Sequence, residues 1–357
     1  MTTRFRTLSV ALATLVLVAG CSGGGATASP SASQPPTSAA PTESAAASAP
    51  ASQAAAELTL AHSYQDAQPQ HACGAQVIAD EAAAANVGLT VEIFGASQLG
   101  GDADRIASVA AGDIDIDIQG ASALSALYAP MSVVDGAFVF DDADHLHRFF
   151  TSDASQPLKD GFLEATNVRI LGAWSAGARQ FTANKAIRTP DDLQGLRMRF
   201  PPSPQFLMNA QAMGASAVEV AFEELYLALQ QGTVDGQENP INNIAANNIQ
   251  EVQDVMSMSS HQLNSNLVVI NEAKWATLSP EQQAALTAAV DKAMLEVPKC
   301  VEEFESETLE EWRTNNVIEI VEDVDREAFR TKAEAYLREN FTEEQVPVLE
   351  AIRSVAN

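Results

Sequence analysis

The chain has 357 residues, of which 46% are hydrophobic, and this is enough for one large or two medium globular domains. Its formal net charge is −27 at pH 7, which makes nucleic acid and anionic membrane surfaces poor partners. An anionic ligand would have to be captured by a local cationic pocket against this adverse overall field.

The first 21 residues are typical of a bacterial lipoprotein signal peptide. Arg4 and Arg6 form a basic start, residues 8–20 form a short apolar run, and small residues precede Cys21. The run is shorter than a membrane-spanning helix needs. We expect Cys21 to be lipidated and to become the mature N-terminus, held by the two chains of a diacylglycerol. The alternative is an ordinary signal peptide that happens to carry a cysteine.

Residues 22–56 consist almost entirely of Gly, Ala, Ser, Thr, Pro and Gln. Such a segment cannot bury a core, so we expect a disordered, flexible tether. The sequence therefore predicts an exported globular body attached to the outer face of the cell membrane.

The body begins with alternating strands and helices. We expect a strand in 56–64, a helix from about 70 to 85 and a strand in 89–95. A helix capped by Asp102 and ended by Gly112 follows, and then another strand. This alternation favours an α/β body with parallel strands.

The second half continues the pattern. Ser279 followed by proline and glutamate is a clear helix start. The expected elements, in chain order, are strands in 169–183, a single turn capped by Thr189, a strand carrying Arg197 and Arg199, an amphipathic helix in 220–232, a strand in 266–271, a helix from about Ser279 to residue 313, a short strand in 317–321 and terminal helices.

Two segments share one plan. Residues 109–122 and 229–242 each contain a helix end, a glycine, a hydrophobic residue and an aspartate, and a carboxamide follows four residues later, Gln119 or Asn239. Two similar lobes would each deliver a strand end to a shared crevice, where open α/β sheets bind ligands. The alternative is chance, because the shared pattern is short.

The sequence gives little support for a metal or cofactor site. The residues His145 and His147 fit a solvated helix start, and no C-x-x-C, H-E-x-x-H or G-x-S-x-G motif occurs. The glycine-rich residues 95–102 lack the lysine of a phosphate-binding loop. Glu238 could act as a general acid or base, but nothing in the sequence nominates its partner. We therefore expect no metal and no cofactor.

Two arginines are better candidates for function. Arg179 and Arg199 lie on predicted strands beside small or proline residues. A guanidinium fork suits bidentate binding of a carboxylate. The alternative is a salt bridge to one of the many acids, and for Arg197 this alternative is favoured.

The remaining cysteines, Cys73 and Cys300, leave two interpretations open. An exported pair can form a disulfide. The pair can equally be two unrelated buried thiols, because the sequence gives no distance between them.

Several motifs together carry a resemblance. They occur in the order GASQLGGD, VAAGDIDI, GARQFTA, TPDDLQGLRMRFPPSP, MGASAVEVAFEELYLALQQGTVDGQENP and WATLSPEQQAAL. In this order they resemble the solute-binding proteins of TRAP transporters, the DctP-type family. The resemblance covers about residues 57–345, and its longest block, 213–240, is highly specific.

The resemblance implies a two-lobe periplasmic-binding-protein-like α/β fold, with hinge strands and a long helix spanning both lobes. Lobe I would comprise 57–176 and 265–304, and lobe II 177–264 and 305–357. It also implies that Arg199 forms the central salt bridge with a ligand carboxylate. The other implied ligand contacts are Arg179, Asn239, Phe222, Gln119, Gly120 and His62, the last of these in the turn His62-Ser63-Tyr64. Where the family often has a proline, this chain has Ser216-Ala217.

We therefore expect a non-enzymatic, lipid-anchored receptor that binds a small carboxylate and delivers it to TRAP membrane subunits. Two alternatives stay open. One is a sensor subunit that presents its ligand to a membrane kinase, and the other is an exported enzyme acting on small organic acids. The sequence leaves the identity of the acid and the oligomeric state open.

Overall fold

A computed structural model describes residues 54–356. The expected signal peptide, the lipidated Cys21 and nearly all of the expected tether lie outside these residues. The described chain corrects the end of the tether. Ala56 already belongs to the first strand, where it pairs with Leu89.

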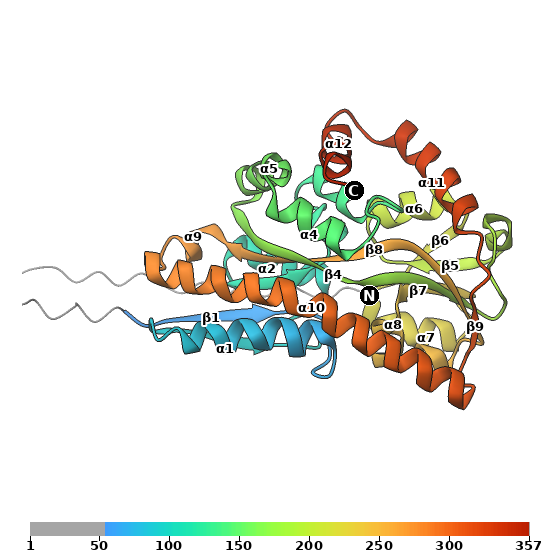
Figure 1. Ribbon diagram of the computed structural model, residues 1–357, viewed down its shortest axis with the longest axis horizontal. Helices are drawn as coiled ribbons and strands as arrows, with labels where there is room; N and C mark the ends of the chain where they lie inside the picture. Colours follow the sequence, from blue (N-terminus) through green and yellow to red (C-terminus); the bar gives the residue numbers. More distant parts are fainter. Residues whose placement is uncertain (1–53, 357) are drawn as a thin grey trace, which may run out of the picture. The chain divides into compact units, whose positions relative to one another are not determined.

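The described strands form one nine-stranded sheet (Figure 1). Their order is β2-β1-β3-β8-β4-β7-β5-β6, and β9 pairs with β8. The strands are β1 (Ala56–Ala61), β2 (Leu89–Phe94), β3 (Ile116–Gln119), β4 (Val168–Ala183), β5 (Arg197–Phe200), β6 (Ser216–Glu219), β7 (Gly236–Pro240), β8 (Val255–Asn271) and β9 (Glu319–Val321).

Pairing directions divide the sheet into a first strand group, β1 to β3, and a second strand group, β5 to β7. Strands within each group run parallel, as expected. The two long strands β4 and β8 are antiparallel to each other and join the groups. They pair from Val168 opposite Asn271 to Ala183 opposite Val255. The sheet is therefore mixed, and β8 begins eleven residues before the strand expected from residue 266.

Helices cover both faces of the sheet (Figure 1). Three apolar clusters lie beneath them. One is under α4, α5, α6, α11 and α12, one is under α1 and α10, and one is around α7 and α8. The helical elements are η1 (Gln70–Ala75, π-helical), α1 (Gln76–Ala84), α2 (Asp102–Ala111), α3 (Ala121–Leu124), η2 (Ala129–Asp135), α4 (Ala143–Thr151), η3 (Asp153–Ser155), α5 (Gln156–Thr166), η4 (Pro190–Leu193), α6 (Pro204–Met213), η5 (Phe222–Glu224), α7 (Leu225–Gln230), α8 (Ile241–Ala246), η6 (Ile249–Glu251), α9 (Glu272–Trp275), α10 (Pro280–Asn315), α11 (Arg326–Asn340) and α12 (Val346–Ser354).

The long helix α10 runs past both strand groups, packing on α1 at one end and on α8 further along (Figure 1). Its start at Ser279 is confirmed, because the Ser279 hydroxyl accepts from the Gln282 backbone N–H at 3.2 Å. A disulfide joins Cys300 of α10 to Cys73 of η1. The structure thus resolves the open question about these cysteines in favour of the bond.

Several local expectations need correction. Asp102 is the first residue of α2, and Gly101 is its N-cap. The expected helix in 220–232 is shorter, because a 3₁₀ turn, η5, precedes α7. His145 is buried rather than solvated, and its Nε2 lies 2.9 Å from the Ile352 carbonyl oxygen.

Candidate functional site

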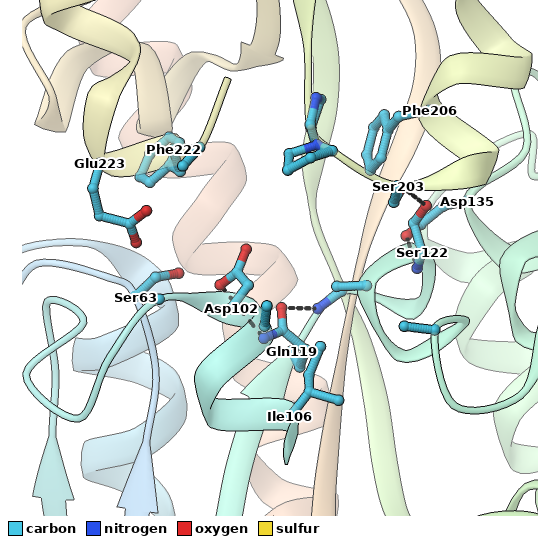
Figure 2. Close-up of a pocket in the computed structure, with 18 of the residues that line it drawn as sticks. Ser63, Asp102, Ile106, Gln119, Ser122, Asp135, Ser203, Phe206, Phe222 and Glu223 are labelled. Atoms are coloured by element: carbon cyan, nitrogen blue, oxygen red, sulfur yellow. Dashed lines mark hydrogen bonds between the residues drawn. The ribbon is translucent and has the colours of Figure 1, made fainter. Parts of the chain in front are cut away.

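A cavity of about 630 Å³ lies between the two strand groups and is lined by residues from both. This volume is within the usual range for small-molecule sites. Figure 2 shows Phe222 and Glu223 on one side of it and Phe206 on the other. The cavity is therefore where the expected ligand contacts have to be located.

Arg199 is the third residue of β5 and lines the cavity. Its side chain is buried, and its Nε donates to the Val220 carbonyl oxygen at 2.9 Å. Its Nη1 has no acceptor among the described residues. Burial lowers the pKa of this guanidinium to about 10, so it stays charged at neutral pH. A buried cation without a counter-ion is suited to pairing with an anion.

Arg179 of β4 also lines the cavity, but its charge is already balanced. Its Nη2 donates to Glu238 Oε1 at 2.7 Å, and its Nε donates to Glu238 Oε2. Its Nη1 donates to Asn264 Oδ1 at 2.7 Å, and its guanidinium stacks on Phe206. The salt bridge considered as the alternative for Arg179 is therefore present, and Arg197 is likewise paired with Asp235.

Glu238 is fully buried, and both of its carboxylate oxygens accept hydrogen bonds from Arg179. Burial opposes its ionisation, but the charge of Arg179 and a hydrogen bond from His261 outweigh burial and lower the pKa of its carboxyl group. His261 Nε2 lies 3.2 Å from Glu238 Oε2. A carboxylate held in this way has no free proton-transfer role, so the geometry does not support Glu238 as a catalytic acid or base.

Asn239 lines the cavity beside this pair. Its Oδ1 accepts from Arg179 Nη2 at 3.1 Å, and its Nδ2 donates to Gln237 Oε1 at 2.5 Å. Asn239 is thus held firmly against the arginine. Its amide groups are already hydrogen-bonded within the protein.

Gln119, Gly120 and Phe222 line the cavity as well. Gln119 Oε1 accepts from the Gly120 backbone N–H at 2.9 Å, which fixes the end of β3 (Figure 2). Gln119 ends β3, and Asn239 lies near the end of β7. The two segments with the shared sequence plan therefore do deliver their strand ends to one cavity.

The structure corrects the expectation for His62, which is absent from the cavity lining. Its side chain is fully buried behind the wall, where its Nδ1 accepts from the Tyr64 backbone N–H at 3.1 Å. Burial, followed by the neighbouring His71, lowers the pKa of the His62 imidazole to about 3, so it is neutral. The next two residues, Ser63 and Tyr64, line the cavity instead.

Sequence reasoning missed several residues of the site. Asp135 accepts from the Ser122 backbone N–H at 2.6 Å and from the Ser265 hydroxyl at 2.7 Å. The hydroxyl groups of Ser122 and Ser203 lie 2.6 Å apart, and this contact links α3 to the turn before α6 (Figure 2). Also missed were Asp102, Phe206, Glu223, Asn243, Asn264 and Asn266. The carboxamides at 264 and 266 give the one usable sequence signal, a polar pair leading into an apolar strand.

Residues 54–356 contain no group of His, Cys, Asp and Glu side chains that could hold a metal ion. Within the same residues, no helix has the length and apolar character needed to cross a membrane.

Comparison with known proteins places this cavity in context. The model of the bacterial extracellular solute-binding protein family 7, DctP, matches residues 60–344. The 2,3-diketo-L-gulonate-binding periplasmic protein of Escherichia coli is 32% identical over 257 residues, which are 72% of this chain and 78% of that protein. The sialic acid-binding periplasmic protein of Vibrio cholerae is 34% identical over 204 residues, which are 57% of this chain and 64% of that protein.

A solved structure is similar over nearly its whole length. It is a TRAP periplasmic solute-binding protein from Roseobacter denitrificans with bound L-galactonate. The TM-score is 0.77 and the sequence identity is 28%, with 83% of this chain and 98% of that chain covered. This likeness confirms the expected two-lobe binding-protein fold.

Proposed function

The chain belongs to the DctP family of TRAP solute-binding proteins, whose members bind substrates and are not enzymes, and on this premise we propose that it captures a carboxylate-containing organic acid between two lobes and delivers it to a TRAP-type transporter. The three relatives described above have 2,3-diketo-L-gulonate, sialic acid and L-galactonate as their ligands, and all three ligands are carboxylates.

The observation that carries the proposal is the unpaired guanidinium of Arg199. The Nη1 group of Arg199 is buried at the cavity wall without an acceptor among the described residues. A ligand carboxylate placed there completes its hydrogen bonds and its charge balance. Exclusion of water from the closed cavity strengthens this pair, because screening falls.

The neighbouring residues assist in this binding. Arg179 is fixed by Glu238 and Asn264, and it holds Asn239 in place at the cavity wall. Phe222, on the opposite side from Phe206, adds an apolar surface against the carbon chain of the ligand (Figure 2). Gln119, at the end of β3, and Gly120, which follows it, line the same cavity.

We further propose that the lobes are residues 57–176 with 265–304 and residues 177–264 with 305–357. The strand pairing supports a hinge at this division. The register of β4 against β8 shifts between Ser175 and Ala178, and Gly177 has a φ of +102°. Irregular strand positions of this kind absorb the backbone rotation of a hinge closure.

The location follows from the N-terminal sequence. Cys21 would carry the lipid, and residues 22–56 would tether the body to the outer face of the cell membrane. The TRAP membrane subunits would then meet the receptor at that face. Replacing Cys21 with Ala should move the exported protein from the membrane fraction to the soluble fraction, and an unchanged distribution would contradict lipid anchoring.

The central test is Arg199→Ala, titrated calorimetrically with a panel of organic acids that bind the parent protein. Loss of the buried partner should cost about 3–5 kcal/mol of binding free energy. Arg197→Ala is the matched control, because Arg197 lies two residues away on β5, is exposed and is paired with Asp235. Unchanged affinity in Arg199→Ala would show that the carboxylate binds elsewhere.

A further inference from the structure

The charges around the cavity are unevenly distributed. Arg179 and Arg199 are the two cationic side chains in the described lining, and Glu238 neutralises the first. One full positive charge therefore remains, at Arg199. It can balance one ligand carboxylate and no more.

Carboxylates line the same cavity in larger number. Asp102 Oδ1 accepts from Arg105 Nη2 at 2.8 Å, but Arg105 also binds the buried Asp117 at 3.0 Å. One guanidinium thus serves two carboxylates, and a negative charge is left over. Glu223 has a single recorded partner in the described chain, the Ser97 hydroxyl at 2.9 Å. Figure 2 shows Asp102, Glu223 and Ser63 gathered around one part of the cavity.

The cavity also offers one buried acceptor that lacks a donor. Asn266 is buried, and its Oδ1 has no partner among the described residues. Its Nδ2 donates to Tyr64 Oη at 2.6 Å and to the Ser265 carbonyl oxygen at 3.1 Å, and these contacts fix the orientation of the amide. A ligand hydroxyl placed beside it would supply the donor that such a buried acceptor needs.

From these observations we propose that the ligand is a monocarboxylate that carries several hydroxyl groups, and that a second carboxylate is excluded. This inference rests on the proposed function, because it takes Arg199 as the anchor. A second carboxylate would meet Asp102 and Glu223 without any cation to balance it. The acceptors come from α2, η5 and β8, so donors are needed at several positions along the ligand. A polyhydroxy chain supplies them, whereas one ammonium group concentrates its donors at one atom.

A matched set of six-carbon acids separates the two parts of this proposal. Aldonates such as gluconate and galactonate differ from the aldarates glucarate and galactarate only in whether the last carbon is a hydroxymethyl group or a carboxylate. Hexanoate and adipate are the corresponding acids without hydroxyl groups. Calorimetric titration of the purified protein should show binding of at least one aldonate, with its aldarate weaker by about tenfold or more. Hexanoate should bind more weakly than that aldonate by a similar factor.

Variants then identify the excluding residues. Asp102→Asn and Glu223→Gln keep the shape of the wall and remove one negative charge each. In both variants the affinity for the aldarate should therefore come closer to the affinity for the aldonate. Glu310→Gln removes the same charge from an exposed position of α10 and should leave the ratio of these two affinities unchanged. Circular dichroism and thermal unfolding verify that each variant is folded. Glu223→Gln alone is sufficient if Asp102→Asn unfolds, because Glu223 is exposed.

The outcomes distinguish this inference from the proposed function. Tightest binding of an aldarate, adipate or an amino acid, abolished by Arg199→Ala, would overturn the inference and leave the receptor function intact. An unchanged affinity ratio in both charge variants would also overturn the assignment of the excluding residues. Carboxylate binding that survives Arg199→Ala would overturn the anchor and, with it, both proposals.

Discussion

Arg179 and Glu238 lie on the adjacent strands β4 and β7 and bind each other through two parallel hydrogen bonds, while Arg199, on the next strand, β5, has no acidic partner within 4.0 Å in the described chain. The register explains the difference. Glu238 lies opposite Phe181, two residues from Arg179 on β4, whereas Arg199 lies opposite the neutral Gln237. The charge of Arg179 is therefore balanced within the protein, whereas the charge of Arg199 is available to a ligand.

Replacing Glu238 with Gln should strongly destabilise the fold. The change leaves Arg179 buried without a counter-charge, and breaking a buried pair typically costs about 3–5 kcal/mol. Chemical denaturation of the ligand-free protein measures the effect. Asp235→Asn is the matched control, because it breaks the exposed pair with Arg197, which should contribute only about 0–1 kcal/mol. Equal losses in the two variants would show that burial does not decide the strength of these pairs.

Replacing Gly177 with Ala should cost more stability than the same change at Gly232. Both glycines have positive φ, +102° and +64°, and that conformation alone costs an alanine about 1–2 kcal/mol. A Cβ at position 177 would also lie 2.5 Å from Glu305 Oε1, whereas nothing lies within 4 Å of a Cβ at position 232. Thermal unfolding of Gly177→Ala and Gly232→Ala measures the two losses of stability. A smaller loss in Gly177→Ala than in Gly232→Ala would contradict the prediction.

Removing the disulfide with Cys73→Ala and Cys300→Ala together should lower stability by about 2–5 kcal/mol. The two cysteines are 227 residues apart, so the bond restricts most of the unfolded chain. A reductant should lower the melting temperature of the parent protein toward that of the double variant. The melting temperature of the double variant should not change with reductant. If the melting temperature of the parent protein is also unchanged, the disulfide is absent in solution.

The stability of the fold should depend on the ionisation of Glu305. Burial raises the pKa of its carboxyl group from 4.5 to about 7, against the opposing hydrogen bonds from Asn242. Between these pH values the native state holds a proton that the unfolded chain has released. The contribution of Glu305 to the free energy of unfolding therefore falls as the pH rises through this window.

Glu305→Gln removes this titration and tests the sign. The stability of the variant relative to the parent protein should increase from about pH 5 to about pH 8. Denaturation at several pH values measures the difference, with Glu310→Gln on the same helix as the control. If the difference in unfolding free energy between Glu305→Gln and the parent protein is the same at every pH, the expected rise in the pKa of Glu305 is contradicted.

Much of the fold was predictable from the sequence, because local patterns determine it. The start of α10 depends on Ser279 and the two residues after it, and the end of α2 depends on Gly112, which has a φ of +86°. The first half of β8 was not predictable. It buries Ser257 and His261 in hydrogen bonds with other parts of the chain, and Ser259 in a hydrogen bond with His261, so it lacks the apolar pattern of a strand.

The site was predictable only in part. The arginines at 179 and 199 and the carboxamide at 239 were expected in the right place, because the family motifs carry them. The neutralisation of Arg179 by Glu238 depends on the register of two strands that are 53 residues apart in the chain at their nearest ends, which no local pattern reveals. The position of His62 behind the wall was also unpredictable, since one residue of difference turns a side chain to the other face of the chain.

The placement of β3 between β1 and β8 constrains the order of folding. Ile116 and Gln119 pair with Ile270 and Leu267, so one edge of β3 remains unpaired until those later residues are available. Contacts between such distant residues slow folding, because a long loop must close before they form. A chain synthesised from its N-terminus therefore leaves this edge of β3 unpaired until about three-quarters of the chain has been made.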